Sequence, residues 1–220
     1  MISYPDTNLQ NYLSALEVAA AAIGVPYRIA ETNSFYNGGA PNVSDSYASA
    51  LWVLDLFTIA QGGSVGVNLH GGGNGSGYTP IADNNGVVVE ARPEYYGVLL
   101  LTLAGQGPLR LTNISAGSLN TSAYTVENSP TQLSLIRLNK DATENLQFTT
   151  TCPSTVQAAT LQELTGPSLA ATSGVTIQVS PVNSDGSFSP QPPYGLVVSG
   201  DTFTGYVPAA SAALVRVTLS

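Results

Sequence analysis

Tyr27-Arg28-Ile29-Ala30-Glu31 is a short apolar run that ends in a carboxylate, and the segments on both sides of it have helical periodicity. Apolar residues recur at helical spacing between residues 9 and 23, and Gly24 marks a helix stop. A glycine-rich loop over residues 37–44 follows the run, and a second helix is expected from about residue 45 to residue 61. The run is therefore predicted to be a strand between two helices.

The same order of segments repeats further along the chain. Residues 65–69 predict a second strand, which runs into His70 and another glycine-rich loop. A third helix is expected from Pro93, since proline suits the first helical turn, to Gly105. This alternation is typical of a parallel sheet or a β/α barrel, in which the loops after the strands form the active-site face.

After Gly107 the pattern becomes all-β. Short runs rich in Leu, Val, Ile and Thr are separated by turn residues, which predicts an antiparallel β-sandwich over residues 108–220 and an α/β part over residues 1–107. An exposed loop is expected over residues 183–193. The predicted strands are 109–114, 123–127, 133–138, 146–151, 156–163, 175–180, 203–207 and 213–219.

Composition excludes several classes of function. Only 9% of the residues are charged, the net charge is −8, and Lys and Arg together number 6. This argues against binding to nucleic acid or to an anionic membrane, because both need clustered cations. Cys152 is the single cysteine and His70 the single histidine, so we expect no internal disulfide, no metal centre and no cofactor. No apolar run is long enough to span a bilayer.

Four N-x-S/T sequons favour an extracellular, secreted parent protein. Residues 1–6 lack the basic and apolar segments of a signal peptide. Both observations agree if the natural N-terminus lies upstream. The sequons begin at Asn42, Asn74, Asn113 and Asn120.

Glu31 is the first candidate for chemistry. A carboxylate at the carboxyl end of a barrel strand faces the active site. Arg28 could keep it ionised, and Asn33 and Ser34 could orient it, which is the environment that a buried glycosidase nucleophile needs. The alternative is a structural Glu that is paired with Arg28 at the end of a strand.

The other candidates lie in the loops that follow the two strands. His70 could donate a hydrogen bond to a sugar hydroxyl or to Glu31. Tyr36, Gly38 and Tyr78 could bind a carboxylate through hydroxyl and backbone N–H groups. Ordinary loop structure is the alternative for each of these residues. However, one strand ends in a Glu and the next in a His, and a loop rich in Gly and Tyr follows each of them, which favours a functional site. Glu94 is assigned to the helix dipole of the third helix, not to chemistry.

Several of these runs together resemble glycoside hydrolase family 79, which contains β-glucuronidases and heparanase-like enzymes. The resemblance is carried by residues 28–39, by Val43-Ser44-Asp45 with Ala50-Leu51-Trp52, and by residues 66–72, 78–81 and 93–97. The β-rich tail, including Leu138-Asn139-Lys140-Asp141, is similar to the C-terminal sandwich of that family.

The resemblance implies the last two βα units of a (β/α)8 TIM barrel in residues 1–107, followed by the sandwich. It implies a retaining mechanism with Glu31 as the nucleophile. Tyr36, Gly38 and Tyr78 match positions that hold the carboxylate of a glucuronic-acid glycan or glycoside, and His70 matches a residue that lines the cleft.

The acid/base Glu of that family lies in an Asn-Glu dipeptide, and no such dipeptide occurs in this chain. Strands one to six of the barrel have no counterpart either. We therefore expect this chain alone to be inactive, as the C-terminal portion of such an enzyme. The alternatives are a non-catalytic carbohydrate-binding or interaction module built on the sandwich, and a half-barrel completed by an upstream half or another chain.

Overall fold

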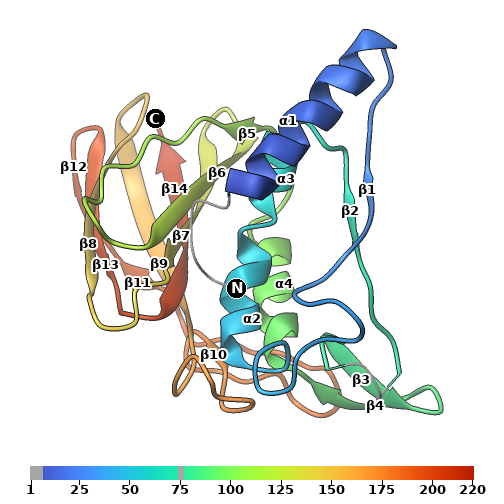
Figure 1. Cartoon of the computed structure of the whole chain (residues 1–220). Coiled ribbons are helices and arrows are strands. Elements are labelled where there is room, and N and C mark those ends of the chain that lie inside the picture. Colours follow the sequence, from blue (N-terminus) through green and yellow to red (C-terminus); the bar gives the residue numbers. More distant parts are fainter. Residues whose placement is uncertain (1–6, 74–76) are drawn as a thin grey trace.

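The structure is a computed structural model, and it describes residues 7–73 and 77–220. Helices, a pair of short parallel strands and a two-stranded hairpin lie on one side, and the two larger antiparallel sheets lie on the other (Figure 1). The predicted order of helices and strands before residue 107 is confirmed, with one added hairpin. The elements of this part are α1 (Thr7–Ala22), β1 (Ile29–Thr32), α2 (Tyr47–Leu54), α3 (Phe57–Gln61), β2 (Val67–Leu69), β3 (Ile81–Asn84), β4 (Val87–Ala91) and α4 (Pro93–Leu103).

The remaining strands form two antiparallel sheets. The larger has the order β10-β9-β14-β7-β6-β5, with β11 also paired to β9, and the smaller has the order β12-β13-β8. Their bounds are β5 (Leu109–Arg110), β6 (Thr121–Ser129), β7 (Gln132–Asn139), β8 (Leu146–Thr151), β9 (Val156–Thr165), β10 (Thr176–Ile177), β11 (Tyr194–Gly195), β12 (Val197–Ser199), β13 (Thr202–Val207) and β14 (Ser211–Leu219). The predicted strand over residues 109–114 is therefore much shorter, and two short strands were missed.

Both faces of the larger sheet are covered. On one face, residues of β7, β9 and β14 pack against the smaller sheet, and the buried Phe203 belongs to that interface. On the other face, α2 and α4 pack through Leu51 and Leu100 against Ile136 and Leu214. One continuous core thus crosses the predicted boundary at residue 107.

The close approach of α2 and α4 depends on Gly97. A Cβ atom at this position would lie 2.3 Å from the carbonyl oxygen of Ala50. Because that distance is far below van der Waals contact, no larger residue fits without moving one of the helices. The two helices are therefore held as a close pair.

The helix predicted over residues 45–61 is interrupted. The chain tightens at the end of α2, where the Asp55 and Leu56 N–H groups bond three residues back, to Trp52 and Val53 at 3.0 and 3.1 Å. The Asp55 carboxylate accepts hydrogen bonds from Ser122 at 2.6 Å and Tyr124 at 2.8 Å and pairs with Lys140. These contacts with β6 and the end of β7 anchor the break.

The hairpin β3–β4 was not predicted. Asn85 and Gly86 join its strands with φ angles of +53° and +80°. Left-handed angles at both central residues suit the twist of a two-residue hairpin. In the sequence, the Asn-Gly pair between two short apolar runs was the signal that indicates such a hairpin.

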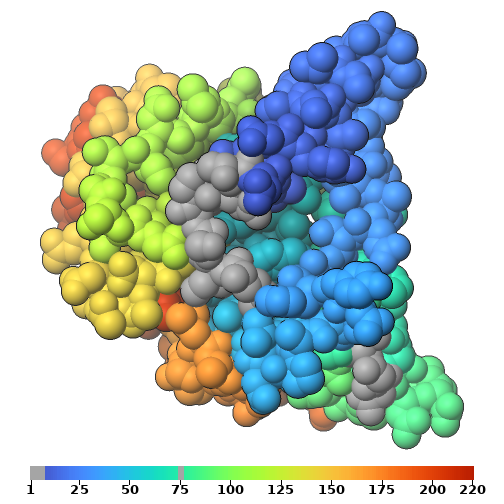
Figure 2. All heavy atoms as spheres, viewed as in Figure 1, coloured from blue at the N-terminus to red at the C-terminus, as the bar shows by residue number. Residues whose placement is uncertain are grey.

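Helix α1 has the predicted position but not the predicted burial. Leu13 is 3% exposed, whereas Tyr12 and Ile23 are 65% and 74% exposed. The C-terminal end of α1 projects from the molecule (Figures 1 and 2). The apolar face of this helix therefore has few partners within the described residues.

Candidate functional site

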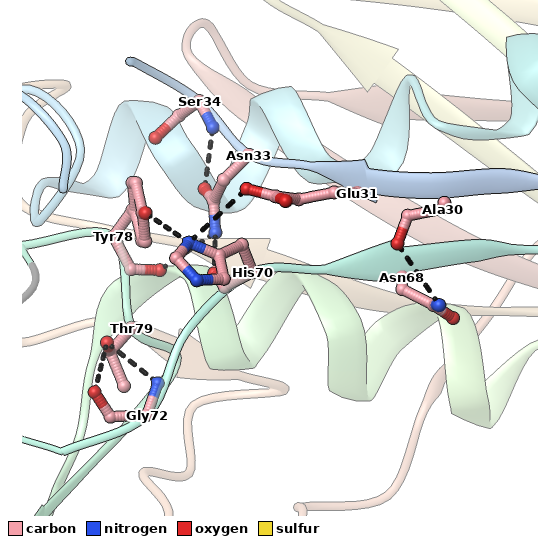
Figure 3. A network of polar contacts seen from close by, with 9 residues as sticks. All are labelled: Ala30, Glu31, Asn33, Ser34, Asn68, His70, Gly72, Tyr78 and Thr79. Carbon is pink, nitrogen blue, oxygen red and sulfur yellow. Dashed lines mark hydrogen bonds and ion pairs between the residues drawn. The ribbon is translucent and has the colours of Figure 1, made fainter. Parts of the chain in front are cut away.

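The two strand ends meet as the sequence predicts. β1 and β2 pair in parallel, with Thr32 opposite Leu69, and the His70 N–H donates to the carbonyl oxygen of Thr32 at 2.9 Å. This register places Glu31 beside His70, with 3.6 Å between the Glu31 Oε1 and His70 Nδ1 atoms (Figure 3). This distance is longer than a normal hydrogen bond. The contact is therefore an ion pair only when the imidazole is protonated.

Tyr78 fixes the imidazole of His70. Its hydroxyl lies 2.5 Å from His70 Nδ1, and the two rings meet edge to face with centroids 5.6 Å apart. Tyr78 is only 5% exposed, so the hydroxyl is held in place by packing. The same nitrogen of His70 therefore faces a buried hydroxyl and a carboxylate.

Asn33 joins the backbone of these loops. Its amide nitrogen donates to the carbonyl oxygens of His70 at 2.7 Å and Tyr78 at 3.2 Å, and its Oδ1 accepts the Ser34 N–H at 2.6 Å (Figure 3). Asn33 and Ser34 were expected to orient Glu31, but these bonds orient the loops around it. We call Glu31, Asn33, His70 and Tyr78 the strand-end site.

Arg28 does not pair with Glu31, so that prediction is wrong. Its Nε and Nη2 atoms donate to Asn68 Oδ1 at 3.2 and 2.7 Å. Arg28 and Glu31 are three residues apart along extended chain, and alternation places them on opposite faces. The Glu31 side chain was also expected to be buried, but it is 70% exposed, because β1 and β2 form a sheet of only two strands.

The loop after β1 contains the remaining predicted residues. Tyr36 is 95% exposed and lies apart from the hydrogen bonds of the strand-end site. Gly38 has a φ of +89°, and its carbonyl oxygen accepts the Gly77 N–H at 2.8 Å. Gly38 thus ties the loop after β1 to the loop that carries Tyr78, whereas Tyr36 faces solvent.

Several other carboxylates before residue 107 have partners of their own. Asp83 accepts the N–H groups of Gly73 and Gly86, each at 2.9 Å. Glu90 lies 3.4 Å from the Arg92 guanidinium, and Asp55 belongs to the cluster described above. Each of them is therefore engaged in local structure.

Glu94 differs from what the sequence predicted. It lies in the first turn of α4, as expected, but it is 0% exposed. Burial raises the pKa of Glu94 to about 8, and the nearby Asn33 amide partly opposes this rise. The carboxyl is therefore mostly protonated at neutral pH and is a poor partner for the helix dipole. Local sequence carries no signal for this burial.

A cavity of about 890 Å³ lies elsewhere, between β6, β7, β8 and residues 110–116. Its lining includes Arg137, Phe148 and Cys152, and no residue of the strand-end site. In the described ranges no three His, Cys, Asp or Glu side chains are grouped to hold a metal ion. No helix of that part is both long and apolar enough to cross a membrane.

No family model matches the chain. The chain is 31% identical over 106 residues to a β-glucuronidase of Aspergillus niger, and this match covers 46% of this chain and 19% of that protein. It is 31% identical over 114 residues to a β-glucuronidase of Neurospora crassa, covering 50% and 20%. The matched segments thus span about a fifth of the length of these curated relatives.

Among solved structures, a 4-O-α-L-rhamnosyl-β-D-glucuronidase from Fusarium oxysporum superposes with a TM-score of 0.74 and 22% identity. The match covers 94% of this chain and 46% of the Fusarium chain. The chain is therefore similar in sequence over about half its length to β-glucuronidases, and it shares its fold with part of a glycoside hydrolase.

Proposed function

We propose that this chain is the C-terminal portion of a retaining β-glucuronidase-like glycoside hydrolase, with Glu31 as the nucleophile. The observation that carries the proposal is the Glu31 carboxylate at the end of a parallel strand, beside a histidine that a buried tyrosine holds. The similarity to β-glucuronidases and the resemblance to family 79 support the same assignment.

In this mechanism a Glu31 oxygen attacks the anomeric carbon, and the bond from that carbon to the leaving group breaks. A second carboxyl, about 5–5.5 Å away in retaining enzymes, protonates the leaving oxygen and then activates the water that releases the sugar. Asp55, Asp83 and Glu90 are engaged elsewhere. The acid/base Glu of the family that the chain resembles stands in an Asn-Glu dipeptide, which this sequence lacks, so we assign the second carboxyl to polypeptide outside this sequence.

The substrate class in this proposal is a glucuronic-acid glycan or glycoside. Tyr36 and Gly38 are proposed contacts of its carboxylate, with Tyr36 free to turn toward a ligand from its exposed loop. The Tyr78 hydroxyl is bound to His70, so we propose that it contacts the substrate together with the imidazole. A protonated His70 would supply positive charge to the substrate carboxylate.

The partner in this proposal is an upstream barrel half or another chain that covers the two-stranded sheet β1–β2. We also propose that the parent enzyme is secreted. The sequon residues Asn42 and Asn113 are exposed, as glycosylation requires, whereas Asn74 lies outside the described residues.

The test uses a substrate that needs no acid catalyst. A 2,4-dinitrophenyl β-glucuronide has a leaving group that departs without a proton, so the nucleophile alone can react with it. We expect stoichiometric release of dinitrophenolate and a glucuronyl ester on Glu31, located by peptide mass spectrometry. Glu31→Gln should abolish the adduct, and the exposed Glu90→Gln should leave it unchanged. An adduct on another residue, or none on the wild-type chain, would contradict the assignment.

The non-catalytic alternative is favoured by one observation, the cavity of about 890 Å³ between the sheets. It predicts saturable binding of a uronic-acid sugar that is insensitive to Glu31→Gln and is weakened by changes at Arg137. Calorimetric titration with glucuronic acid distinguishes this function from the first.

A further inference from the structure

The cavity between the two larger sheets is a second candidate site, separate from Glu31. It measures about 890 Å³ and lies between the larger sheet and β8, with residues 110–116 along its side. Pockets that bind small molecules have about 300–1,000 Å³, so the space suffices for a small organic ligand. We call it the sandwich slot, and its walls include Leu133, Leu135 and Arg137 of β7 and Leu146, Phe148 and Thr150 of β8.

Arg137 brings a positive charge into this slot. Leu133 and Leu135 belong to the core between the two sheets, and alternation along β7 turns Arg137 toward the same interior. Arg137 is only 7% exposed, its Nη2 atom donates to Thr150 Oγ1 at 2.8 Å, and its guanidinium carbon lies 5.6 Å from the centroid of the Phe148 ring. The fold therefore holds a guanidinium in a fixed place between the sheets.

This guanidinium has no counter-charge within residues 7–73 and 77–220. None of the ion pairs of that part includes Arg137, and its Nε atom is buried without a hydrogen-bond partner. Glu127, the one carboxylate among the described lining residues, pairs with Arg110 instead. Burial lowers the pKa of Arg137 to about 10, so the group is still charged at neutral pH. Because buried charges are normally paired, the slot lacks an anion.

The chemistry of the slot selects both ends of a ligand. The planar guanidinium of Arg137 matches the two oxygens of a carboxylate, and the Thr150 hydroxyl keeps a proton that it can donate to the same anion. The walls beyond Arg137 are apolar side chains, and the hydroxyls of Thr112 and Thr125 bind one another at 2.7 Å. A sugar ring would lose hydrogen bonds to water there, whereas an apolar body would not.

We propose that the sandwich slot binds a small organic acid with an apolar body, whose carboxylate is held by Arg137. This inference goes beyond the proposed glycosidase function, because it makes no use of Glu31. It also differs from the non-catalytic alternative in the class of ligand, since that alternative requires a hydroxylated, uronic-acid sugar.

The experiment compares four probes by calorimetric titration of the whole chain. Hexanoate has the charge and the apolar body, hexanol lacks the charge, acetate lacks the body, and glucuronate has a hydroxylated body. We expect hexanoate to bind at one site, at least about tenfold more tightly than each of the others. Equal affinities for hexanoate and hexanol would overturn the role of the guanidinium. Glucuronate that binds as tightly as hexanoate would overturn the apolar class and support the sugar-binding alternative.

A matched pair of variants tests the anchor. Arg137→Met removes the charge and keeps much of the volume, so we expect the affinity for hexanoate to fall about tenfold while that for hexanol is kept. Arg216→Met is the control, because Arg216 donates to Gln162 and Leu103 and does not line the slot. Unchanged binding of hexanoate to Arg137→Met would refute the proposal. If this variant does not fold, the four probes on the wild-type chain still decide.

The single cysteine reports where the ligand binds. Cys152 lines the slot, so saturating hexanoate should slow the alkylation of its thiol by iodoacetamide, and the alkylated protein should no longer bind hexanoate. An unchanged rate would place the ligand elsewhere and overturn the assignment.

A strand of another polypeptide is the other occupant that this place admits, because β8 is an edge strand of the smaller sheet. An extended Val-Thr-Val-Glu-Val-Thr peptide with blocked ends is the probe for it. Binding of this peptide without binding of hexanoate would overturn the small-acid class. Failure of the glycosidase proposal is distinguishable from all of these outcomes, since hexanoate should bind equally to Glu31→Gln.

Discussion

At the scale of single residues, the hydroxyl of Tyr78 is the group that orients His70 toward Glu31. Tyr78→Phe removes one hydrogen bond from a buried ring, which is worth about 1 kcal/mol, or a factor of about five in rate. We expect the formation of the Glu31 adduct to slow by roughly this factor while the fold is kept. The measurement is the rate of dinitrophenolate release, with Tyr194→Phe on β11 as the control. An unchanged rate would show that the hydroxyl does not orient the imidazole.

Glu94 should also give the protein a pH-dependent stability. Because burial raises the pKa of Glu94 from 4.5 to about 8, the folded state keeps its proton where the unfolded state loses it. The contribution of Glu94 to the free energy of unfolding is therefore fully present below about pH 4.5 and is lost as the pH rises to about 8, by on the order of 5 kcal/mol. Urea denaturation at several pH values should show a flatter dependence for Glu94→Gln. Equal slopes in both proteins would exclude a shifted pKa.

At the scale of elements, the contact between the α2–α3 break and the larger sheet includes the ion pair of Asp55 with Lys140. The Lys140 side chain is 0% exposed, and burial lowers its pKa while Asp55 opposes that effect. Asp55→Asn removes the carboxylate that pairs with the buried Lys140 ammonium, and we expect a loss of about 3–5 kcal/mol in the free energy of unfolding. The double variant Asp55→Asn with Lys140→Met should recover much of it. Chemical denaturation of the three proteins measures both effects.

The helix pair α2–α4 makes a second prediction at this scale. Gly97→Ala places a methyl group 2.3 Å from the Ala50 carbonyl oxygen, so the helices must separate. Overpacking of this kind destabilises by about 1–3 kcal/mol, more than the gain of about 1 kcal/mol from helix propensity. Gly195→Ala, where the space around the added methyl is open, is the matched control. A rise in melting temperature for Gly97→Ala would contradict the close contact.

At the scale of the whole molecule, stability should be uneven. The larger sheet and the helices α2 and α4 share a core of fully buried side chains, whereas α1 projects and β1–β2 is a sheet of only two strands. Backbone amides exchange slowly where opening exposes a core and quickly where few apolar contacts break. We expect hydrogen exchange to be fastest in α1, intermediate in β1–β2, and slowest in β7 and β14. Equal protection of α1 and β14 would contradict this uneven distribution of stability.

The sequence alone determined the order of helices and strands before residue 107, the start of α4 at Pro93, and the meeting of Glu31 and His70 at parallel strand ends. Periodicity, proline and glycine act on neighbouring residues, so these features can be inferred from local sequence. The Asn-Gly hairpin was also readable in this way but was missed.

Only the tertiary structure decided which partner each polar side chain found. Arg28 binds Asn68 and not Glu31, Asp55 is bound by residues far along the chain, and Glu94 is fully buried. Burial and pairing depend on segments that are distant in sequence, which no local pattern reports. The same long-range packing joins the helices and the larger sheet in one core across residue 107, because an amphipathic helix must cover its apolar face against another element.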